Sequence, residues 1–431
     1  NGQVHELTPA RIAPETAERV ADTTRSIYRR LGCYGIIRID YILTGEKGAE
    51  QINMLEINTT PGMTATSFIP QQVRAAGLDI KDVLSEIIEG KFSYWITTSI
   101  IAIMTLHDFD NIRPFEPEEL PEAFASLLSD EEFLQIAEQF FPNVRTEAFR
   151  QKLAGCTTNL DVQIGYFLPL LTSLVKKCTT AFDIDSAAIP DKSQPYTFIS
   201  NHRDIVLDSA FLSILLIANG FPTTVEIAIG DNLLIRPWIR TLVRINKSFI
   251  VQRSASIREK LASSKQLSEY MHYAIAEKRE NIWIAQREGR AKDSDDRTQE
   301  ALLKMMAMGG EGTPLERIKS LNLVPLSISY EYDPCDFLKA KEFQQKRDIE
   351  GFKKSKQDDL DNMRSGIFGY KGRVHYCAAA PVNTWIDSLA DLPKADFFKA
   401  LAEGIDRAIH SRYLITPGNC VAADELAGEE R

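Results

Sequence analysis

The residues best suited to acid–base chemistry lie in a short polar turn that contains Asn201, His202 and Asp204. A neutral histidine can take a proton from a hydroxyl group, and a neighbouring carboxylate then orients the ring and stabilises the imidazolium. Two carboxylates, Asp204 and Asp208, follow His202 closely in the chain. The alternative is a histidine that caps a helix or fills the core, which is the usual role of an isolated histidine.

The elements on either side of this turn should hold it rigidly. Residues 196–200 are aromatic and β-branched, which favours a strand, and an apolar helical run begins near Leu207. Functional groups are often carried on loops that rigid elements position. We therefore expect His202 to lie where a strand gives way to a helix.

The same stretch resembles the glycerolipid acyltransferases, the enzymes that acylate glycerol 3-phosphate and lysophosphatidate. Their first motif is Asn-His followed, after four residues, by Asp, whereas five residues separate His202 from Asp208 here. Asp204 lies closer and stays open as a partner. We favour Asp208, because it opens the apolar helix as the aspartate of the family does.

Three further motifs of that family follow in the same order. The strand-like run 249–253 ends in an arginine and resembles the second motif, Glu-Gly-Arg after the run 281–285 matches the third, and 323–330 carries a proline like the fourth. Glycine lets the backbone approach a ligand closely, and arginine can bind a phosphate with two hydrogen bonds. The resemblance implies that the acceptor substrate is bound by Arg253, Glu288, Gly289 and Arg290.

The resemblance also implies a fold and a reaction. The fold is an α/β core, a mixed sheet flanked by helices with the site at the strand ends. The reaction is transfer of a fatty acyl group from acyl-CoA or acyl carrier protein to a hydroxyl of glycerol 3-phosphate or a lysophospholipid. His202 would deprotonate the hydroxyl, with Asp208 orienting it, and neither a metal nor another cofactor is expected to take part.

A second set of polar residues lies near the N-terminus, on strands expected over 34–43 and 51–58. Side chains alternate along a strand, so Arg38 and Asp40 share one face of the first strand, and Glu56 and Asn58 share one face of the second. Oxygen ligands of this kind suit Mg²⁺ that bridges nucleotide phosphates. The alternative is a pair of strands with solvated polar faces.

The residues that follow resemble the C-terminal part of D-alanine–D-alanine ligases, which are ATP-grasp enzymes. The stretch Asn58-Thr-Thr-Pro-Gly-Met-Thr64, with Ser67 and Pro70 after it, carries the resemblance, which covers residues 5–90. It implies use of Mg²⁺ and ATP. By this resemblance the magnesium ligands are Asp40, Glu56 and Asn58, the tetrahedral intermediate is stabilised by Arg38 and Gly62, and Ser67 holds a substrate carboxylate.

The parts of such a ligase that precede this segment, including most of the ATP-binding half, have no counterpart in the sequence. We therefore expect a partial ATP-grasp α+β module that is inactive by itself. The first residue is Asn1 rather than methionine, so we expect the chain to begin inside a longer protein. The alternative function for the chain is ATP-dependent D-Ala–D-Ala ligation for peptidoglycan precursors.

These features divide the chain into a ligase-like fragment over residues 1–92, a junction over 93–104 and an acyltransferase domain over 105–431. The domain begins with a helical lead-in over 105–190, before a catalytic core over 191–431. Within the lead-in, residues 161–180 read as one long apolar helix that Pro169 should kink.

Composition limits the partners and the compartment. The net charge of −10 argues against a general nucleic-acid-binding protein, and six scattered cysteines fit a reducing cytosol. No run reaches the roughly 18–20 apolar residues of a spanning helix. Arg236, Arg240 and Arg244 share one helical face, which suits lipid phosphates or a solvated surface. We expect a cytoplasmic protein in peripheral contact with the inner face of the membrane; a non-catalytic membrane adaptor is a third hypothesis.

Overall fold

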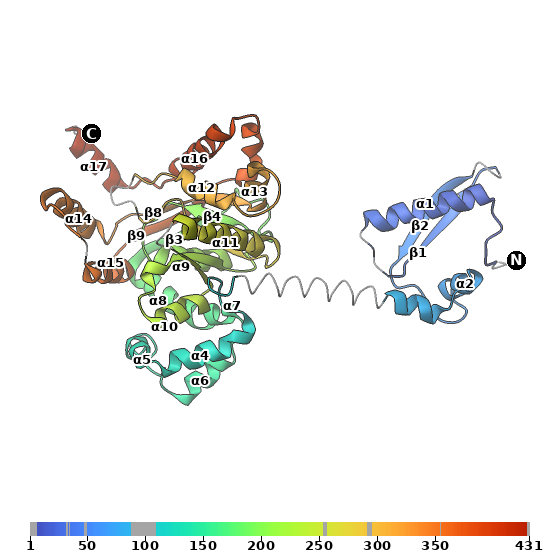
Figure 1. Ribbon diagram of the computed structural model, residues 1–431, viewed down its shortest axis with the longest axis horizontal. Coiled ribbons are helices and arrows are strands. Elements are labelled where there is room, and N and C mark those ends of the chain that lie inside the picture. The colour runs from blue at the N-terminus through green and yellow to red at the C-terminus, as the bar shows by residue number, and fades with distance from the viewer. Residues whose placement is uncertain are drawn as a thin grey trace. The chain divides into compact units, whose positions relative to one another are not determined.

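A computed structural model describes residues 7–31, 33, 35–46, 50–87, 109–252, 257–290, 295–353 and 355–428. The chain divides into two compact units, Asn1–His107 and Asp108–Arg431. Figure 1 labels the helices and strands of both units. The expected junction over 93–104 lies outside the described residues.

The first unit contains the two strands expected from the sequence. β1 (Arg38–Thr44) and β2 (Gln51–Asn58) pair in antiparallel fashion, so that Asp40 lies opposite Glu56 and Arg38 lies opposite Asn58. Helix α1 (Pro14–Arg30) begins at a proline, whose fixed φ suits the first turn of a helix. Helix α2 (Phe68–Ala75) follows the loop after β2, and residues 80–87 are also helical.

The second unit is built around a seven-stranded mixed sheet with the strand order β3-β9-β8-β4-β7-β5-β6. The neighbouring strands run parallel except for β8 and β9, which are antiparallel. The α/β fold with a mixed sheet is therefore confirmed. The strands are β3 (Thr179–Asp185), β4 (Thr197–Ser200), β5 (Val225–Gly230), β6 (Ser248–Val251), β7 (Asn281–Ala285), β8 (Leu323–Tyr330) and β9 (Gly372–Ala378).

Helices cover both faces of this sheet and enclose two apolar cores (Figure 1). Alternate side chains of β4 point to opposite faces, so Phe198 enters one core and Ile199 the other. Helices α8 (Leu168–Cys178) and α9 (Leu207–Ala218) pack on the Phe198 side. The Ile199 side is covered by α11 (Ile257–Ala276), α12 (Glu300–Met306), α13 (Pro314–Ser320) and α16 (Lys394–His410).

The lead-in forms a third apolar cluster with α10 (Pro237–Ile245). The expected long helix over 161–180 is interrupted: a π-helical turn, η2 (Gln163–Phe167), precedes α8, and Pro169 lies in the first turn of α8. The end of that range is not helical, because Thr179 begins the edge strand β3. The lead-in elements are η1 (Pro117–Glu119), α4 (Leu120–Ser129), α5 (Glu131–Ala137), α6 (Glu147–Ala154) and α7 (Asn159–Val162).

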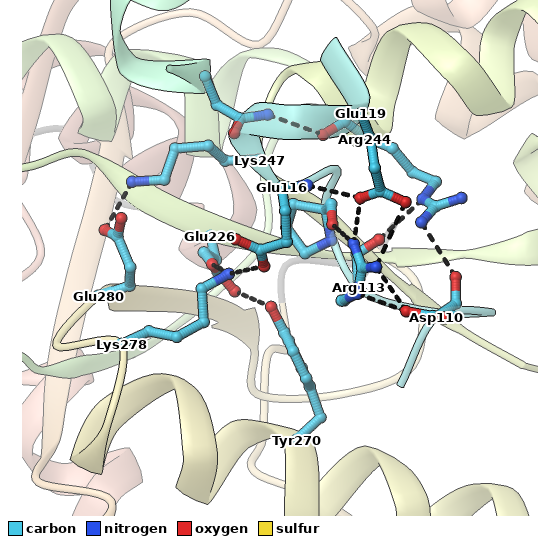
Figure 2. Close-up of polar contacts among 12 residues, drawn as sticks. Asp110, Arg113, Glu116, Glu119, Glu226, Arg244, Lys247, Tyr270, Lys278 and Glu280 are labelled. Carbon is cyan, nitrogen blue, oxygen red and sulfur yellow. Dashed lines mark hydrogen bonds and ion pairs between the residues drawn. The ribbon is translucent and has the colours of Figure 1, made fainter. Parts of the chain in front are cut away.

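Buried ion pairs fasten the start of the lead-in to the sheet domain (Figure 2). Lys278 lies 3.0 Å from Glu226 and 3.2 Å from Glu116, and Glu226 also accepts a hydrogen bond from Tyr270. Glu226 is the second residue of β5, whereas Glu116 belongs to the lead-in. The attraction of Lys278 for two carboxylates therefore joins the two regions, and these carboxylates raise the pKa of Lys278 against the opposing effect of burial.

The arginines at the start of and along α10 also contact the lead-in. Arg244 packs 4.1 Å from the ring centre of Phe115 and donates hydrogen bonds to the carbonyl oxygens of Arg113 and Asp110. Arg240 bonds the carbonyl of Asn111, and Arg236 lies 3.4 Å from a carboxylate oxygen of Glu132. Arg244 is thus held by the lead-in, whereas Arg236 and Arg240 are exposed although each makes a contact with it. Binding of lipid phosphates by this face stays a prediction.

The remaining elements follow β5 and β8. They are η3 (Asp231–Leu233), α14 (Asp336–Asp348), α15 (Lys356–Phe368), η4 (Val382–Thr384), η5 (Ile386–Leu389) and α17 (Pro417–Ala427). Within the described ranges, no helix combines the length and the apolar character needed to cross a bilayer.

Candidate active site

His202 lies in the turn between β4 and α9, beside the carboxylate of Asp208. The ring nitrogen Nδ1 is 2.8 Å from Asp208 Oδ2. The side chain of Asp208 is fully buried, whereas 13% of the His202 side chain is exposed. The turn therefore presents the imidazole to the surface and keeps its partner carboxylate out of water.

Hydrogen-bond donors surround the buried carboxylate of Asp208. Oδ2 accepts from the backbone N–H groups of Arg203, at 2.6 Å, and Asp204, at 3.0 Å. Oδ1 accepts from the hydroxyl of Tyr330 at 3.0 Å. Burial of a carboxylate costs less free energy when such donors replace the lost hydration, and Asp208 has donors on both oxygens.

Asp204 has a different role from Asp208. Its Oδ1 accepts hydrogen bonds from the backbone N–H groups of Val206 and Leu207, so it caps the start of α9. Burial raises the pKa of Asp204, and repulsion from Asp208 adds to the rise. Of the two candidate carboxylates, Asp208 is therefore the one that lies against the ring.

Two further side chains fix the ends of the strands around His202. The amide of Asn201 donates to the carbonyl of Ile328 and accepts from its N–H, both at 2.8 Å, so it ties the turn to β8. The ring of Trp283 meets the His202 ring edge-on with 5.5 Å between centres, and its indole N–H donates to Ser200 Oγ. Both contacts restrict the orientation of the imidazole.

The Glu-Gly-Arg stretch begins at the same edge of the sheet. β7 pairs in parallel with β4, and Ala285 lies opposite Ser200, so the chains leave both strands together at this edge. Gly289 has a φ of 70°, a conformation that glycine adopts without strain, and the N–H of Glu288 bonds Gln299. Arg290 is close enough to Asp204 to lower the pKa of that carboxyl, against the larger effect of burial.

One hydrogen-bond donor of Arg290, the buried Nη1, has no partner within the described residues. A buried guanidinium nitrogen without a partner is costly, and a bound anion would satisfy it. Arg253, the other arginine that the sequence assigns to the substrate, lies outside the described residues.

The geometry defines what His202 can do. A hydrogen bond from Nδ1 to a carboxylate fixes the tautomer in which Nδ1 carries the proton. The other ring nitrogen, Nε2, is then the acceptor, and Asp208 stabilises the positive charge that develops when it takes a proton. The pair can therefore act as a general base toward a hydroxyl group.

Three residues near His202 and Asp208 were not identified from the sequence. They are Trp283 of β7, Tyr330 of β8 and Tyr376 of β9, whose hydroxyl donates to the backbone carbonyl oxygen of Asp208 at 3.0 Å. All three strands lie far from His202 along the chain. The strand over 323–330 was expected, but only the pairing order of the sheet brings its last residue to Asp208. The sequence did contain one signal for Tyr330. It is a tyrosine at the end of a buried strand, and that end lies on the edge of the sheet that carries the site.

The ligase-like residues are drawn together on β1 and β2. Arg38 lies 3.0 Å from Asp40 Oδ1 and 3.2 Å from Glu56 Oε1, and Asn58 Oδ1 accepts from the N–H of Thr60. Among the described residues, no three or more His, Cys, Asp or Glu side chains are grouped to hold a metal ion. The predicted ligands are two carboxylates and an amide, and Arg38 forms ion pairs with both carboxylates. The assignment of Asp40, Glu56 and Asn58 as magnesium ligands stays a prediction.

Gly62 and Ser67 lie next to each other in the loop before α2. A Cβ atom on Gly62 would come within 2.9 Å of Ser67 Oγ. That oxygen accepts from the N–H of Thr64 and lies 2.7 Å from the Thr64 hydroxyl. The roles that the ligase resemblance gives to Arg38, Gly62 and Ser67 stay predictions.

Comparison with known proteins shows that two parts of the chain are similar to two different families. Residues 1–89 match the family described as D-ala D-ala ligase C-terminus, and residues 184–315 match the acyltransferase family. The D-alanine–D-alanine ligase of Bacteroides fragilis is 68% identical over 92 residues, which are 21% of this chain and 28% of the relative. That of Phocaeicola vulgatus is 67% identical over the same shares. The chain thus spans less than a third of the length of these relatives.

A solved structure covers more of the chain at a lower level of similarity. The crystal structure of the 1-acyl-sn-glycerophosphate (LPA) acyltransferase PlsC from Thermotoga maritima is 12% identical, with a TM-score of 0.36. It covers 68% of this chain and 94% of that protein. From the two family matches, the chain carries an acyltransferase domain over residues 184–315, preceded over residues 1–89 by a D-alanine–D-alanine ligase C-terminal segment.

Proposed function

We propose that the protein transfers a fatty acyl group from a thioester, acyl-CoA or acyl carrier protein, to a hydroxyl of glycerol 3-phosphate or a lysophospholipid. The observation that carries this proposal is the contact between His202 and the buried carboxylate of Asp208. The acyltransferase match over residues 184–315 includes both residues and supplies the class of reaction.

In the proposed mechanism His202 Nε2 takes the proton from the acceptor hydroxyl as its oxygen attacks the thioester carbonyl. A carbon–oxygen bond forms, the carbon–sulfur bond breaks, and the thiolate leaves with the proton from the imidazolium. Asp208 stabilises the imidazolium between these two steps. The ester and the free thiol are the products, and no covalent acyl-enzyme is needed.

The acceptor phosphate would be bound by arginine. Arg290 is placed in the loop after β7, at the edge of the sheet that carries His202, and its Nη1 is unpartnered among the described residues. We assign Arg253, Glu288 and Gly289 to the same phosphate-bearing acceptor. A lipid acceptor is reached at a membrane surface, so we place the protein in the cytoplasm, peripheral on the inner face of the membrane.

The fatty chain of the donor would enter an apolar pocket beside α9. The volume of this pocket is about 30 Å³, far below the roughly 300–1,000 Å³ of small-molecule sites, so its walls would have to move apart to admit the chain. The pocket residue Ala210 lies two positions after Asp208 in α9. The pocket is lined by Gln163, Ile164, Phe167, Leu168, Leu171, Ala210, Ser213, Ile214, Ile217, Thr224, Ile227 and Asn246.

The experiment incubates the purified chain with labelled acyl thioesters and a panel of phosphorylated glycerols, and identifies the lipid formed. His202→Ala should lower the rate by about 10³-fold or more, because it removes the base. His375→Ala is the matched control, since His375 also bonds an aspartate, Asp183, but on β9 and the edge strand β3. Equal rates for wild type and His202→Ala would rule out the mechanism.

D-Ala–D-Ala ligation is the second candidate, favoured by the identity of residues 1–92 to known ligases. The ligase-like segment matches 28% of its relative's length, and the sequence has no counterpart of most of the ATP-binding half. We therefore expect no ATP-dependent formation of D-Ala–D-Ala by this chain. Turnover with Mg²⁺, ATP and D-alanine would reverse that expectation.

A further inference from the structure

The Asp208 carboxylate has a partner from β8 that the motifs do not include. Tyr330, the last residue of β8, donates its hydroxyl to Oδ1 at 3.0 Å, on the oxygen that does not face His202. Residue 330 is separated from Asp208 by 122 positions in the chain, and the contact exists because β8 lies beside β4 in the sheet. His202, Asp208 and Tyr330 thus form a continuous row of hydrogen bonds.

We infer that Tyr330 is a positioning residue for acyl transfer, which acts by holding and partly neutralising the carboxylate that orients His202. The inference rests on the proposed function, because it assigns Tyr330 a part in the same proton transfer. Tyr330 reaches the imidazole only through Asp208 and has no part in binding substrate.

The chemistry of the tyrosine suits this role. Burial raises the pKa of Tyr330 well above its ordinary value, and the nearby Tyr376 and Asp208 add to the rise. The hydroxyl therefore stays protonated and can only donate to the carboxylate. A hydrogen bond to a charged group contributes about 1.5–3 kcal/mol, and leaving Oδ1 bare would concentrate negative charge next to the ring.

The same aspartate provides an internal comparison. Tyr376, on β9, donates to the backbone carbonyl oxygen of Asp208, also at 3.0 Å. Tyr376 is fully buried and Tyr330 is partly buried. Both bond the same residue and their side chains also meet each other, but only Tyr330 bonds its carboxylate. Changing each to phenylalanine removes one hydroxyl and keeps the ring, so the two variants separate the charge effect from the packing effect.

Other ionisable groups near the row stay the same in both variants. Asp204 lies in the same turn and faces Asp208, and both carboxylates act on the two phenols. Arg290, from the loop after β7, and Lys371, before β9, face Asp204. Because these groups are unchanged, a difference between the two variants reports on the hydroxyl of Tyr330.

The experiment measures two quantities on the full chain, wild type, Tyr330→Phe and Tyr376→Phe. The first is kcat and KM for acyl transfer as a function of pH. The second is the protonation of the His202 ring, followed by NMR with ¹⁵N-labelled histidine and assigned with His202→Ala. Thermal unfolding of each variant records the loss of stability that either change causes.

For Tyr330→Phe we expect kcat to fall about 10-fold to 100-fold with little change in KM. The His202 ring should become protonated at a higher pH than in wild type, because the more basic carboxylate favours the imidazolium. Tyr376→Phe should lose stability without moving that midpoint. An unmoved midpoint in Tyr330→Phe, or an equal shift in both variants, would overturn the inference.

The two readouts also separate this inference from the proposed function. If wild type forms no lipid from any thioester, the proposed function fails, and the NMR midpoints still decide whether Tyr330 acts on His202 through Asp208. If wild type is active and Tyr330→Phe keeps wild-type kcat and midpoint, the inference alone fails.

Discussion

At the scale of single residues, the chemistry depends on which carboxylate His202 meets. Asp208 lies 2.8 Å from the ring, whereas Asp204 caps α9 through Oδ1. The two aspartates share one turn and are both buried. Changing each aspartate in turn to the same residue therefore tests which of them is the partner of His202, because the surroundings of the two are similar.

Asp208→Asn should lower kcat by about 10³-fold or more, because a neutral amide no longer stabilises the imidazolium or fixes the tautomer. Asp204→Asn should keep most of the activity, since an amide oxygen can still accept from the N–H groups of Val206 and Leu207. Steady-state kinetics of acyl transfer distinguish the two. Loss of equal size in both variants would contradict the pairing of His202 with Asp208.

The sequence was sufficient to predict the site residues that lie within the motifs, but not the residues that contact them from other strands. His202 and Asp208 lie six positions apart, so the short turn between β4 and α9 brings them within reach. Tyr330 and Tyr376 meet Asp208 from 122 and 168 positions away. Such contacts depend on the order of strands in the sheet, which no pattern in a single strand specifies.

At the scale of elements, α9 carries Asp208, the proposed partner of His202, at one end and apolar residues that line a pocket along one side. Ala210, Ser213, Ile214 and Ile217 of this helix line the pocket. Ala210 lies two positions from Asp208, so its side chain points to the other side of α9 from the carboxylate. Blocking that position should act on the length of the acyl chain rather than on the base.

Ala210→Trp should lower kcat/KM for long-chain thioesters more than for short ones. The expected loss is roughly tenfold for every two methylene groups excluded, since each buried methylene contributes about 0.8 kcal/mol. A series of acyl-CoA lengths measures it. Ala218→Trp, at the exposed C-terminal end of the same helix and outside the pocket, is the control. A uniform loss over all chain lengths would exclude the pocket as the site of the acyl chain.

Elements with a strong local signal were predicted well. β7 and β8 have the bounds expected from their apolar runs. The helix predicted over 161–180 was wrong at its C-terminal end, because β3 continues the apolar character and only pairing with β9 makes residues 179–185 a strand.

At the scale of the whole molecule, the sheet domain depends on the ion pairs that hold its lead-in. Glu226 is 1% exposed and shares Lys278 with Glu116 (Figure 2). Without the lysine, a buried carboxylate would keep only the hydroxyl of Tyr270 among the partners drawn. Removing one member of a buried pair leaves an uncompensated charge, which is costly.

Lys278→Met should therefore lower the free energy of unfolding by about 3–5 kcal/mol. Lys304→Met is the matched control, because Lys304 pairs with Glu300 at 2.7 Å on an exposed helix face and should cost less than about 1 kcal/mol. Urea unfolding followed by circular dichroism measures both. Equal losses would mean that the Lys278 cluster does not stabilise the domain.

The ligase-like unit has very little core of its own. In its described part only Thr16, Pro61 and Pro70 are buried, while Leu31, Met54 and Leu55 are each at least half exposed. The sheet of the second unit is different, since every residue of β4 and seven of the eight in β8 are buried. Burial of apolar surface is the main source of stability, so the two units should open with very different free energies.

We therefore expect the backbone amides of β1 and β2 to exchange with solvent deuterium far faster than those of β4 and β8. Both sets are hydrogen-bonded within sheets, so the bonds themselves do not distinguish them, and the difference measures the packing around each sheet. Hydrogen-exchange mass spectrometry on the full chain resolves the two units by peptide. If β1 and β2 were as protected as β8, the ligase-like unit would have to be stabilised by contacts beyond its own described side chains, and a binding partner for that unit would become the first thing to seek.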